Sequence, residues 1–587
     1  MRVERALPWV SLTASTSAVV FDPKIDLSLL GPIYLPSANR SFEAWDNAVI
    51  QATATLNVII QTGNSTYGPF DNLGTSFSAS VFDLGNNEPL FDFHFEAPQL
   101  NGSCTRGKLT DDTIYRTGSL GKLLVMYAWM IDIGDSIFTE PITKYVPELA
   151  AAAQSYQNPL LQTNWSEVTV GSLASQISGI GRGEVSLGDL ASEGFQQPPV
   201  STNIPNGFPP LGNETVINCS SYGPEPPCTR AQFFTQVINH PPVFLSYTSP
   251  SYSNIAYSIL GYAYENITGK TINQGQLDFA QKLGMNSTTP TPPGNNVDAI
   301  IPRNDSYAMW SYDLNVQDPA GGQYISTRDL ITWGQAILNN KLISPVVTRR
   351  WMKPTTFTSQ WAAAVGAPWE IYRLPTLINT ILNTSRIVDT YSKSGDVGQY
   401  STYFGLVPDY NIGITVLAAG DNPNSQVAPV RGTLVDIFYT AAEAAAKQQA
   451  SNAFTGTFKS TDRNSSITLA VDGGPGVVIK QWISNSTNFL NNEFYAEFND
   501  FRLYPTDLKM WSSEGLTYYK FHMDCLTRNG APISSDPWSE YNDYWFQLDG
   551  LSYNLLAPDA FVVGFDENGI VQSLASQALR TTMVRST

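Results

Sequence analysis

Residues 115–122 read Tyr-Arg-Thr-Gly-Ser-Leu-Gly-Lys and continue into the apolar segment 123–129, Leu-Leu-Val-Met-Tyr-Ala-Trp. The apolar run predicts a helix, so Ser119 and Lys122, three residues apart at its start, lie on one face and one turn apart. The hydroxyl is then within reach of the amine, which is the arrangement of a nucleophile beside a base. No other lysine of the chain has a serine three residues before it.

The amine of Lys122 can act as a base only if it is neutral at working pH. Burial or a neighbouring cation would have to lower its pKa from the ordinary value of about 10.4. A helix that opens into the core offers both burial and the positive end of a helix dipole. The alternative is that Ser119 caps the helix and Lys122 lies on the surface, because Ser-x-x-Lys is a loose pattern.

A second group, Tyr252-Ser253-Asn254, stands where another apolar helix is predicted to begin. A phenol beside a lysine can share the proton of a serine hydroxyl and later donate it to a leaving group, and the amide of Asn254 can orient the lysine and the substrate. Tyr264 and Asn266 have the same spacing, but they lie inside the predicted helix, so we take that match as a coincidence. On its own, a tyrosine such as Tyr252 is most often a packed aromatic residue.

A third group, Lys393-Ser394-Gly395-Asp396, ends a predicted strand. A strand edge beside a nucleophile offers backbone N–H groups for an oxyanion, and glycine permits a close approach. The lysine supplies positive charge for a substrate carboxylate or another polar group. Taken alone, this triplet is also ordinary turn chemistry.

Composition places the chain among globular proteins. Its 587 residues exceed what one hydrophobic core usually supports, so two domains are expected, and hydrophobic residues at 42% supply ample core. The formal net charge of −18 argues against nucleic acid or an anionic membrane as a partner. No apolar run reaches the roughly 18 to 20 residues that a membrane span needs.

Asparagines in the Asn-x-Ser/Thr pattern are dense along the whole chain. Their number favours a secreted glycoprotein that carries N-glycans. Residues 6–21 are interrupted by Pro, Ser and Thr, so a signal peptide is weak in this sequence or missing from it. The acceptor positions are Asn39, Asn64, Asn101, Asn164, Asn213, Asn218, Asn266, Asn286, Asn304, Asn383, Asn464 and Asn485.

The four cysteines are even in number, which suits disulfides in an oxidising compartment. Cys219 and Cys228 flank a turn-rich segment, so we predict that they form a disulfide. Cys104 and Cys525 would then be left to tie the N-terminal region to the C-terminal one, although connectivity cannot be read from sequence.

Helical and alternating segments succeed one another up to residue 450. Sheet segments stand at both ends with helices between them, which predicts one α/β (α+β) domain over residues 1–450, an antiparallel sheet flanked by helices with its core at about 75–445. Residues 181–230 are irregular and are expected to shape the substrate site. The predicted helices are 42–61, 230–239, 255–261, 326–338 and 427–449, and the predicted hairpins join 77–82 to 90–95 and 400–407 to 412–418.

From residue 451 onward the sequence pattern changes to short segments of strand-like alternation separated by Asn, Asp and Gly. This pattern predicts a separate all-β domain over residues 451–587, a small barrel or a sandwich. Its predicted strands are 457–459, 466–471, 476–482, 518–523, 544–548 and 561–565.

Taken in order, Ser-x-x-Lys, Tyr-x-Asn and Lys-Ser-Gly resemble the motifs of the serine β-lactamase and penicillin-binding-protein superfamily, particularly its class C, esterase and D-aminopeptidase branches. The neighbouring stretches 141–149, 319–329 and 404–409 are similar to the segments that accompany these motifs. The resemblance spans residues 75–445. With the β-domain behind it, the chain resembles secreted fungal β-lactamase-like proteins.

The resemblance implies a role for each motif residue. Ser119 would attack a carbonyl, Lys122 and Tyr252 would act as base and then acid, and Asn254 would orient Lys122. Lys393, with Ser394 and Gly395, would assist Tyr252 and the substrate. The backbone N–H groups of Ser119 and Asp396 would form the oxyanion hole. An acyl-enzyme would follow, to be resolved by water or another acceptor.

Two features depart from the family pattern, namely Gln176, where members commonly carry a histidine, and the long segment 181–230. The first is expected to affect packing and the second the identity of the substrate. No cofactor or metal is expected, because His94, His240 and His522 are scattered and no His or Cys cluster has ligand spacing.

The sequence therefore predicts a secreted serine hydrolase or acyltransferase. Its substrate would be a small-molecule or peptide-like acyl compound, namely an ester, lactone, amide or D-amino-acid peptide. The alternatives are a β-lactamase proper and a catalytically silent binding protein on the same fold. The oligomeric state cannot be read from the sequence.

Overall fold

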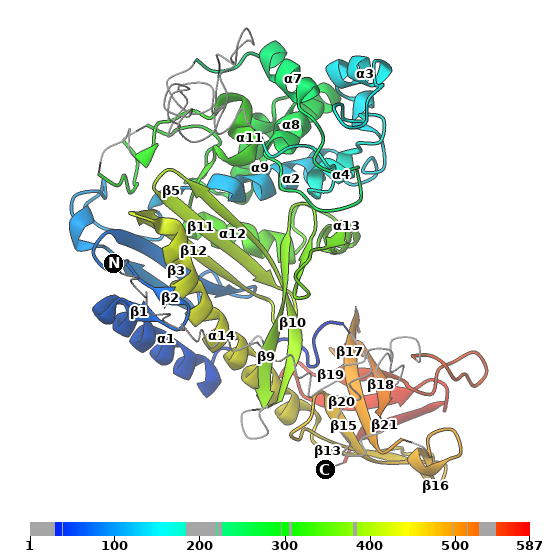
Figure 1. The fold of residues 1–587 in the computed structure, drawn as a ribbon. Helices are drawn as coiled ribbons and strands as arrows, with labels where there is room; N and C mark the ends of the chain where they lie inside the picture. Colours follow the sequence, from blue (N-terminus) through cyan, green and yellow to red (C-terminus); the bar gives the residue numbers. More distant parts are fainter. Residues whose placement is uncertain are drawn as a thin grey trace, which may run out of the picture.

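The computed structural model describes most of the chain (Figure 1). Much of the irregular segment 181–230 lies outside the described residues, as do Asn213, Asn218, Asn304 and Asn383. The described residues are 30–37, 39–183, 219, 226–294, 296–303, 308–379, 384–496, 498–512, 515–526 and 548–586.

An eight-stranded antiparallel sheet forms the centre of the larger domain. The first hairpin pairs with the last strand over nine residues, from Ile412 opposite Asp83 to Gly420 opposite Thr75. Segments more than 300 residues apart thus share one sheet, as the sequence predicted. In spatial order the strands are β4 (Phe91–Phe95), β3 (Thr75–Asp83), β12 (Ile412–Gly420), β11 (Tyr400–Val407), β10 (Thr384–Val397), β9 (Glu370–Asn379), β8 (Ala363–Val365) and β7 (Thr356–Phe357).

Helices cover both faces of this sheet (Figure 1). One face packs on α1 (Glu43–Thr62) and α14 (Pro423–Phe454), whose buried residues share a core with β3, β11 and β12. The other face meets α12 (Thr327–Leu338), beyond which lies the helical region. In the described part of that region the other helices are α2 (Gly121–Asp132), α3 (Pro147–Gln154), α4 (Val170–Ala174), α7 (Arg230–Asn239), α8 (Ile255–Thr268), α9 (Ile272–Leu283), α11 (Asp318–Gly321) and α13 (Pro345–Trp351).

Local sequence explains where the principal helices begin and end. In α1 the buried residues Trp45, Ala52 and Leu56 recur at helical spacing, and the helix ends at Gly63 with φ of 68°. Ser326 caps α12 by accepting a hydrogen bond from the backbone N–H of Asp329. α2 is buried from Gly121 to Met130, and over that stretch Lys122 is its one charged residue.

Helix α14 is longer than the predicted 427–449 and serves two cores. Its residues up to Ala445 pack beneath the central sheet. Ala446, Ala450, Ala453 and Phe454 pack in the core of the C-terminal domain. Figure 1 shows the helix crossing the sheet and reaching that domain.

The C-terminal domain is a closed antiparallel barrel of eight strands, which decides between the two predicted architectures. The closing pair joins β14 to β15, with Ser466 opposite Ile483, and the short β16 (Thr487–Asn488) lies outside the ring. The predicted strand 544–548 lies outside the described residues except for residue 548. The barrel strands are β13 (Gly456–Lys459), β14 (Ser466–Ala470), β15 (Val477–Ser484), β17 (Asp500–Trp511), β18 (Thr517–Leu526), β19 (Ala560–Phe565), β20 (Val571–Ser576) and β21 (Thr581–Arg585).

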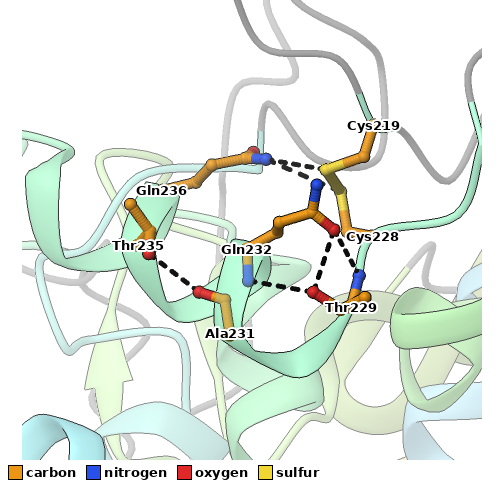
Figure 2. The surroundings of a disulfide bond; sticks show 7 residues. All are labelled: Cys219, Cys228, Thr229, Ala231, Gln232, Thr235 and Gln236. Carbon is orange, nitrogen blue, oxygen red and sulfur yellow. Dashed lines mark hydrogen bonds between the residues drawn. A yellow bond between two sulfur atoms is a disulfide. The ribbon is translucent and has the colours of Figure 1, made fainter.

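The cysteines divide into one bonded pair and two free thiols. Cys219 and Cys228 form the predicted disulfide, with Cα atoms 4.8 Å apart, and Figure 2 shows Gln236 beside both sulfur atoms. The predicted pairing of Cys104 with Cys525 is wrong, because both are free. Cys104 is buried in the core of the helical region, and Cys525 is partly buried against the barrel core, so each packs as a small apolar side chain.

Among the described residues, none of the helices combines the length and the apolar character that crossing a bilayer demands.

Candidate active site

Ser119 lies in a one-turn 3-10 segment, Gly118–Leu120, that leads directly into α2. Gly118 has φ of 52°, and a Cβ atom there would lie 2.4 Å from the backbone nitrogen of Asp396. A Cβ atom on Gly395 would lie 2.1 Å from the carbonyl oxygen of Thr117. These two glycines therefore let the serine turn rest against the backbone of β10.

The side chains of Ser119, Lys122 and Tyr252 meet at one point. Lys122 Nζ lies 3.0 Å from Ser119 Oγ, and the Tyr252 hydroxyl donates to the same Oγ at 2.6 Å. Lys122 is fully buried and Ser119 makes no capping hydrogen bond, so the alternative of a helix cap and a surface lysine is wrong.

The amine of Lys122 has two further hydrogen-bond partners, and both are oxygen atoms that can only accept a hydrogen bond. It donates to Asn254 Oδ1 at 2.8 Å and to the carbonyl oxygen of Ala320 at 2.6 Å. A neutral amine has two protons, which these acceptors take, so its lone pair faces Ser119 Oγ. The surroundings thus orient Lys122 to receive the proton of the serine.

Electrostatics lower the pKa values of both groups that contact Ser119. Burial lowers the pKa of Lys122 to about 8, with Lys393 and Arg182 adding to the effect against the opposing influence of Tyr252. Burial alone would raise the pKa of Tyr252, but the cations Lys122 and Lys393 outweigh it and lower the value to about 8. The pair is therefore poised to exchange one proton near neutral pH.

We expect the rate of acyl transfer to follow the titration of this pair. Below about pH 8 the pair holds an additional proton, so it cannot accept the proton of Ser119. With a neutral ester as substrate, kcat/KM should rise with pH through about 8, measured as an initial-rate profile in buffers of constant ionic strength. A profile that falls with pH in the same interval would contradict this role for the pair.

Lys393, on β10, lies close to the group formed by Ser119, Lys122 and Tyr252. Its Nζ is 5.4 Å from the centre of the Tyr252 ring, and it forms an ion pair with Glu370, the first residue of β9. Glu370 also binds Ser394. Sequence reasoning missed Glu370, and only a correct pairing of β9 with β10 could have found it.

The predicted oxyanion donors border the same space as the hydroxyl. A Cβ atom on Gly395 would lie 2.6 Å from the backbone nitrogen of Ser119, which shows how closely β10 approaches that residue. Ser119 and Asp396 line one cleft of about 280 Å³. Its lining also includes Gly118, Arg182, Tyr252, Asn254, Ala320, Glu370, Lys393, Ser394 and Gly395.

Gln176, where the family pattern commonly has a histidine, holds the Tyr252 loop. Its side chain accepts from the backbone N–H of Ser253 and donates to the carbonyl oxygen of Ser253 at 3.2 Å. Its own carbonyl oxygen accepts from the N–H of Ser251 at 2.8 Å. The predicted packing role is thus a set of hydrogen bonds that positions the residues on both sides of Tyr252.

Arg182 is a further residue that sequence reasoning missed. Its guanidinium carbon lies 5.0 Å from the centre of the Tyr252 ring, and its side chain is exposed at the cleft. Arg182 stands at the start of the segment 181–230, which was expected to shape the substrate site. The rest of that segment up to residue 218 is not described beyond Gly183.

None of the three histidines lines the cleft. His94 lies on β4, and the structure brings it together with Asp92 and Asp111, with ligand-type atoms within 4.8 Å of one another. The spacing in the sequence did not predict this grouping. His94 Nε2 lies 2.9 Å from Asp92 Oδ2, and Arg328 forms an ion pair with Asp111, so charges of both signs meet there.

Comparison with known proteins identifies the family. A serine hydroxyl beside a buried lysine on a mixed α/β fold suggests a serine hydrolase, and residues 70–435 match the model described as Beta-lactamase. The chain therefore belongs to the β-lactamase family, within the β-lactamase-like serine hydrolases. Residues 446–587 match the model described as "Beta-lactamase-like-like, C-terminal domain".

Three curated relatives are each 26% identical to the chain. A "Beta-lactamase-like protein" of Arthroderma benhamiae matches over 475 residues, 75% of this chain and 74% of the relative. "Probable hydrolase M10" of a Phoma species matches over 72% of this chain and 69% of its own length. "Probable hydrolase clz13" of Cochliobolus lunatus matches over 74% of this chain and 71% of its own length.

Two matches among solved structures are lower in sequence identity. A class C β-lactamase is 14% identical with a TM-score of 0.44, covering 68% of this chain and 98% of the other. An octameric penicillin-binding protein homologue from Pyrococcus abyssi is 15% identical with a TM-score of 0.47, and the match covers 92% of this chain and 100% of the other.

Proposed function

We propose that the protein is a serine hydrolase or acyltransferase that works through an acyl-enzyme on Ser119. The observation that carries this proposal is the convergence of Lys122 Nζ and the Tyr252 hydroxyl on Ser119 Oγ, at 3.0 Å and 2.6 Å. A hydroxyl with two proton-transfer groups of lowered pKa in contact is an activated nucleophile. Its substrate would be an ester, a lactone, an amide or a D-amino-acid peptide.

In the acylation step, Ser119 Oγ forms a bond to the substrate carbonyl carbon and its proton passes to the pair of Lys122 and Tyr252. The carbonyl oxygen gains negative charge, which the backbone N–H groups of Ser119 and Asp396 stabilise. The bond to the leaving group then breaks, and Tyr252 donates the proton that the leaving group needs.

In the second step, water or another acceptor attacks the acyl carbon. The pair of Lys122 and Tyr252 takes the acceptor's proton, the bond to Ser119 Oγ breaks, and the serine regains a proton. The site begins the next cycle in its original protonation state. Asn254 and Ala320 hold the amine of Lys122 in place throughout.

We also propose that the protein is secreted and glycosylated. Of the acceptor asparagines that the structure describes, all except Asn164 have exposed side chains. The disulfide between Cys219 and Cys228 fits an oxidising compartment.

The test is covalent labelling with a fluorophosphonate probe, followed by mapping of the adduct by mass spectrometry. We expect one adduct on Ser119, and turnover within a panel of esters, lactones and D-peptides that Ser119→Ala abolishes. Labelling that persists in Ser119→Ala would overturn the proposal. A wild-type protein that neither reacts with the probe nor turns over any member of the panel would favour a binding protein on the same fold.

A further inference from the structure

Glu370 forms hydrogen bonds with the polar groups of Lys393 and Ser394 at the wall of the cleft. Its Oε1 accepts from Lys393 Nζ. Its Oε2 accepts from the backbone N–H of Ser394 at 3.0 Å and from the Ser394 hydroxyl at 2.8 Å. One carboxylate therefore binds both side chains that would otherwise be available to an acidic group of a substrate.

The position of Glu370 is fixed by its neighbours in the sheet. Its backbone pairs with Ser392, whose hydroxyl donates to the Glu370 carbonyl oxygen at 2.8 Å. Trp369 before it and Ile371 after it are buried in the core of the helical side. The backbone is thus held on both sides, and three hydrogen bonds to Lys393 and Ser394 hold the carboxylate itself beside Lys393.

Lys393 has little capacity left for another anion. Its side chain is 3% exposed, against 25% for Glu370. A second hydrogen bond of its ammonium goes to the carbonyl oxygen of Ser394 at 2.7 Å, and the Tyr252 ring lies near by. A substrate carboxylate would have to compete with Glu370 for a cation that is already neutralised and buried, which is costly.

The other charges around the cleft leave it close to neutral. Arg182 is a cation of the lining, but its side chain is exposed, so water and salt screen it. Asp396, which is exposed as well, adds one negative charge to the same lining and is screened in the same way. In its active form the pair of Lys122 and Tyr252 carries no net charge. The described lining therefore offers no buried, uncompensated cation.

From this arrangement we infer that Glu370 determines substrate specificity, and that the site selects acyl donors without a carboxylate near the reacting carbonyl. The inference rests on the proposed function and narrows it to uncharged esters, lactones and amides. It also distinguishes this chain from an enzyme whose Lys-Ser-Gly strand binds an acidic group of the substrate.

The test compares two esters of equal length and one leaving group, 4-nitrophenyl hexanoate and mono-4-nitrophenyl adipate. They differ in that the adipate ends in a carboxylate where the hexanoate ends in a methyl group. We expect the wild type to show a kcat/KM about tenfold or more higher for the neutral ester, and Glu370→Gln to reduce that preference about tenfold. The first expectation uses the wild type alone, so it is tested even if Glu370→Gln does not fold.

Asp389→Asn is the matched control. Asp389 lies on β10 and pairs with Arg373 of β9 at 3.2 Å, so the variant removes one carboxylate from the same two strands, away from the cleft lining. It should leave the preference unchanged. A thermal unfolding curve for each variant checks that the fold is retained.

The outcomes separate this inference from the proposed function. If Ser119-dependent hydrolysis is found but the wild type shows no preference, or Glu370→Gln leaves the preference intact, the inference is overturned and the proposed function stands. An equal shift in Asp389→Asn would also overturn it. If neither ester is hydrolysed and the probe does not label Ser119, the proposed function falls and the inference with it.

Discussion

Replacing Lys122 with methionine should lower kcat/KM for any substrate of the site by about a thousandfold, because it removes the amine that takes the serine proton. Methionine has a similar length and no charge, so it suits a fully buried position. Asn254 Oδ1 and the carbonyl oxygen of Ala320 lose a donor, and we expect a modest fall in stability as well. Steady-state kinetics and a thermal unfolding curve measure the two effects separately.

Lys144→Met is the control for this variant. Lys144 is 54% exposed and forms an ion pair with Glu140 at 3.1 Å on the surface. Its replacement should leave kcat/KM within a factor of about two, since exposed ion pairs contribute little. If Lys122→Met retained activity within about tenfold of the wild type, Lys122 would not be the base, and Tyr252 would have to serve alone.

Replacing Arg386 with methionine should destabilise the protein by about 3–5 kcal/mol, the usual cost of removing one member of a buried ionic group. The Arg386 side chain is 1% exposed and donates to Asp409 Oδ2 at 2.7 Å and to Glu443 Oε2 at 3.2 Å. Without it, two carboxylates remain buried next to each other. Urea denaturation followed by tryptophan fluorescence measures the loss.

Two further variants make this prediction specific. Adding Asp409→Asn and Glu443→Gln to Arg386→Met should recover part of the stability, because no uncompensated charge is then buried. Arg350→Met, which breaks a pair with Asp135 on the surface, should shift the urea midpoint far less. An equal loss from the two arginine variants would show that burial does not set the cost.

The site residues that could be predicted from the sequence share one property: each belongs to a short motif of neighbouring residues. Ser119 and Lys122 lie within one helical turn, and Tyr252 and Asn254 stand at the start of α8. Each pattern was ambiguous alone, and the structure brings them together at hydrogen-bonding distance. The two hairpins and the main helices were predictable for the same reason, since their periodicity is local.

The residues that were missed depend on pairing between distant segments. Glu370 reaches Lys393 because β9 aligns with β10 at one particular register, and a shift of one residue would turn its side chain to the other face. Closure of the barrel depends on the pairing of β14 with β15, which no alternation within a strand reveals. The wrong pairing of Cys104 with Cys525 came from counting, which does not tell where a thiol is buried.

Helix α14 couples the unfolding of the two domains. It runs for 32 residues from Pro423, its first residue, to Phe454, and its one internal proline, Pro429, lies in its first third, so the part that joins the two cores is continuous helix. A continuous helix resists bending, so the barrel is carried as a stiff extension of the central sheet and cannot swing as a tethered module would. Heat should therefore melt both cores in one calorimetric transition, with the loosening of either one fraying the helix that the other needs.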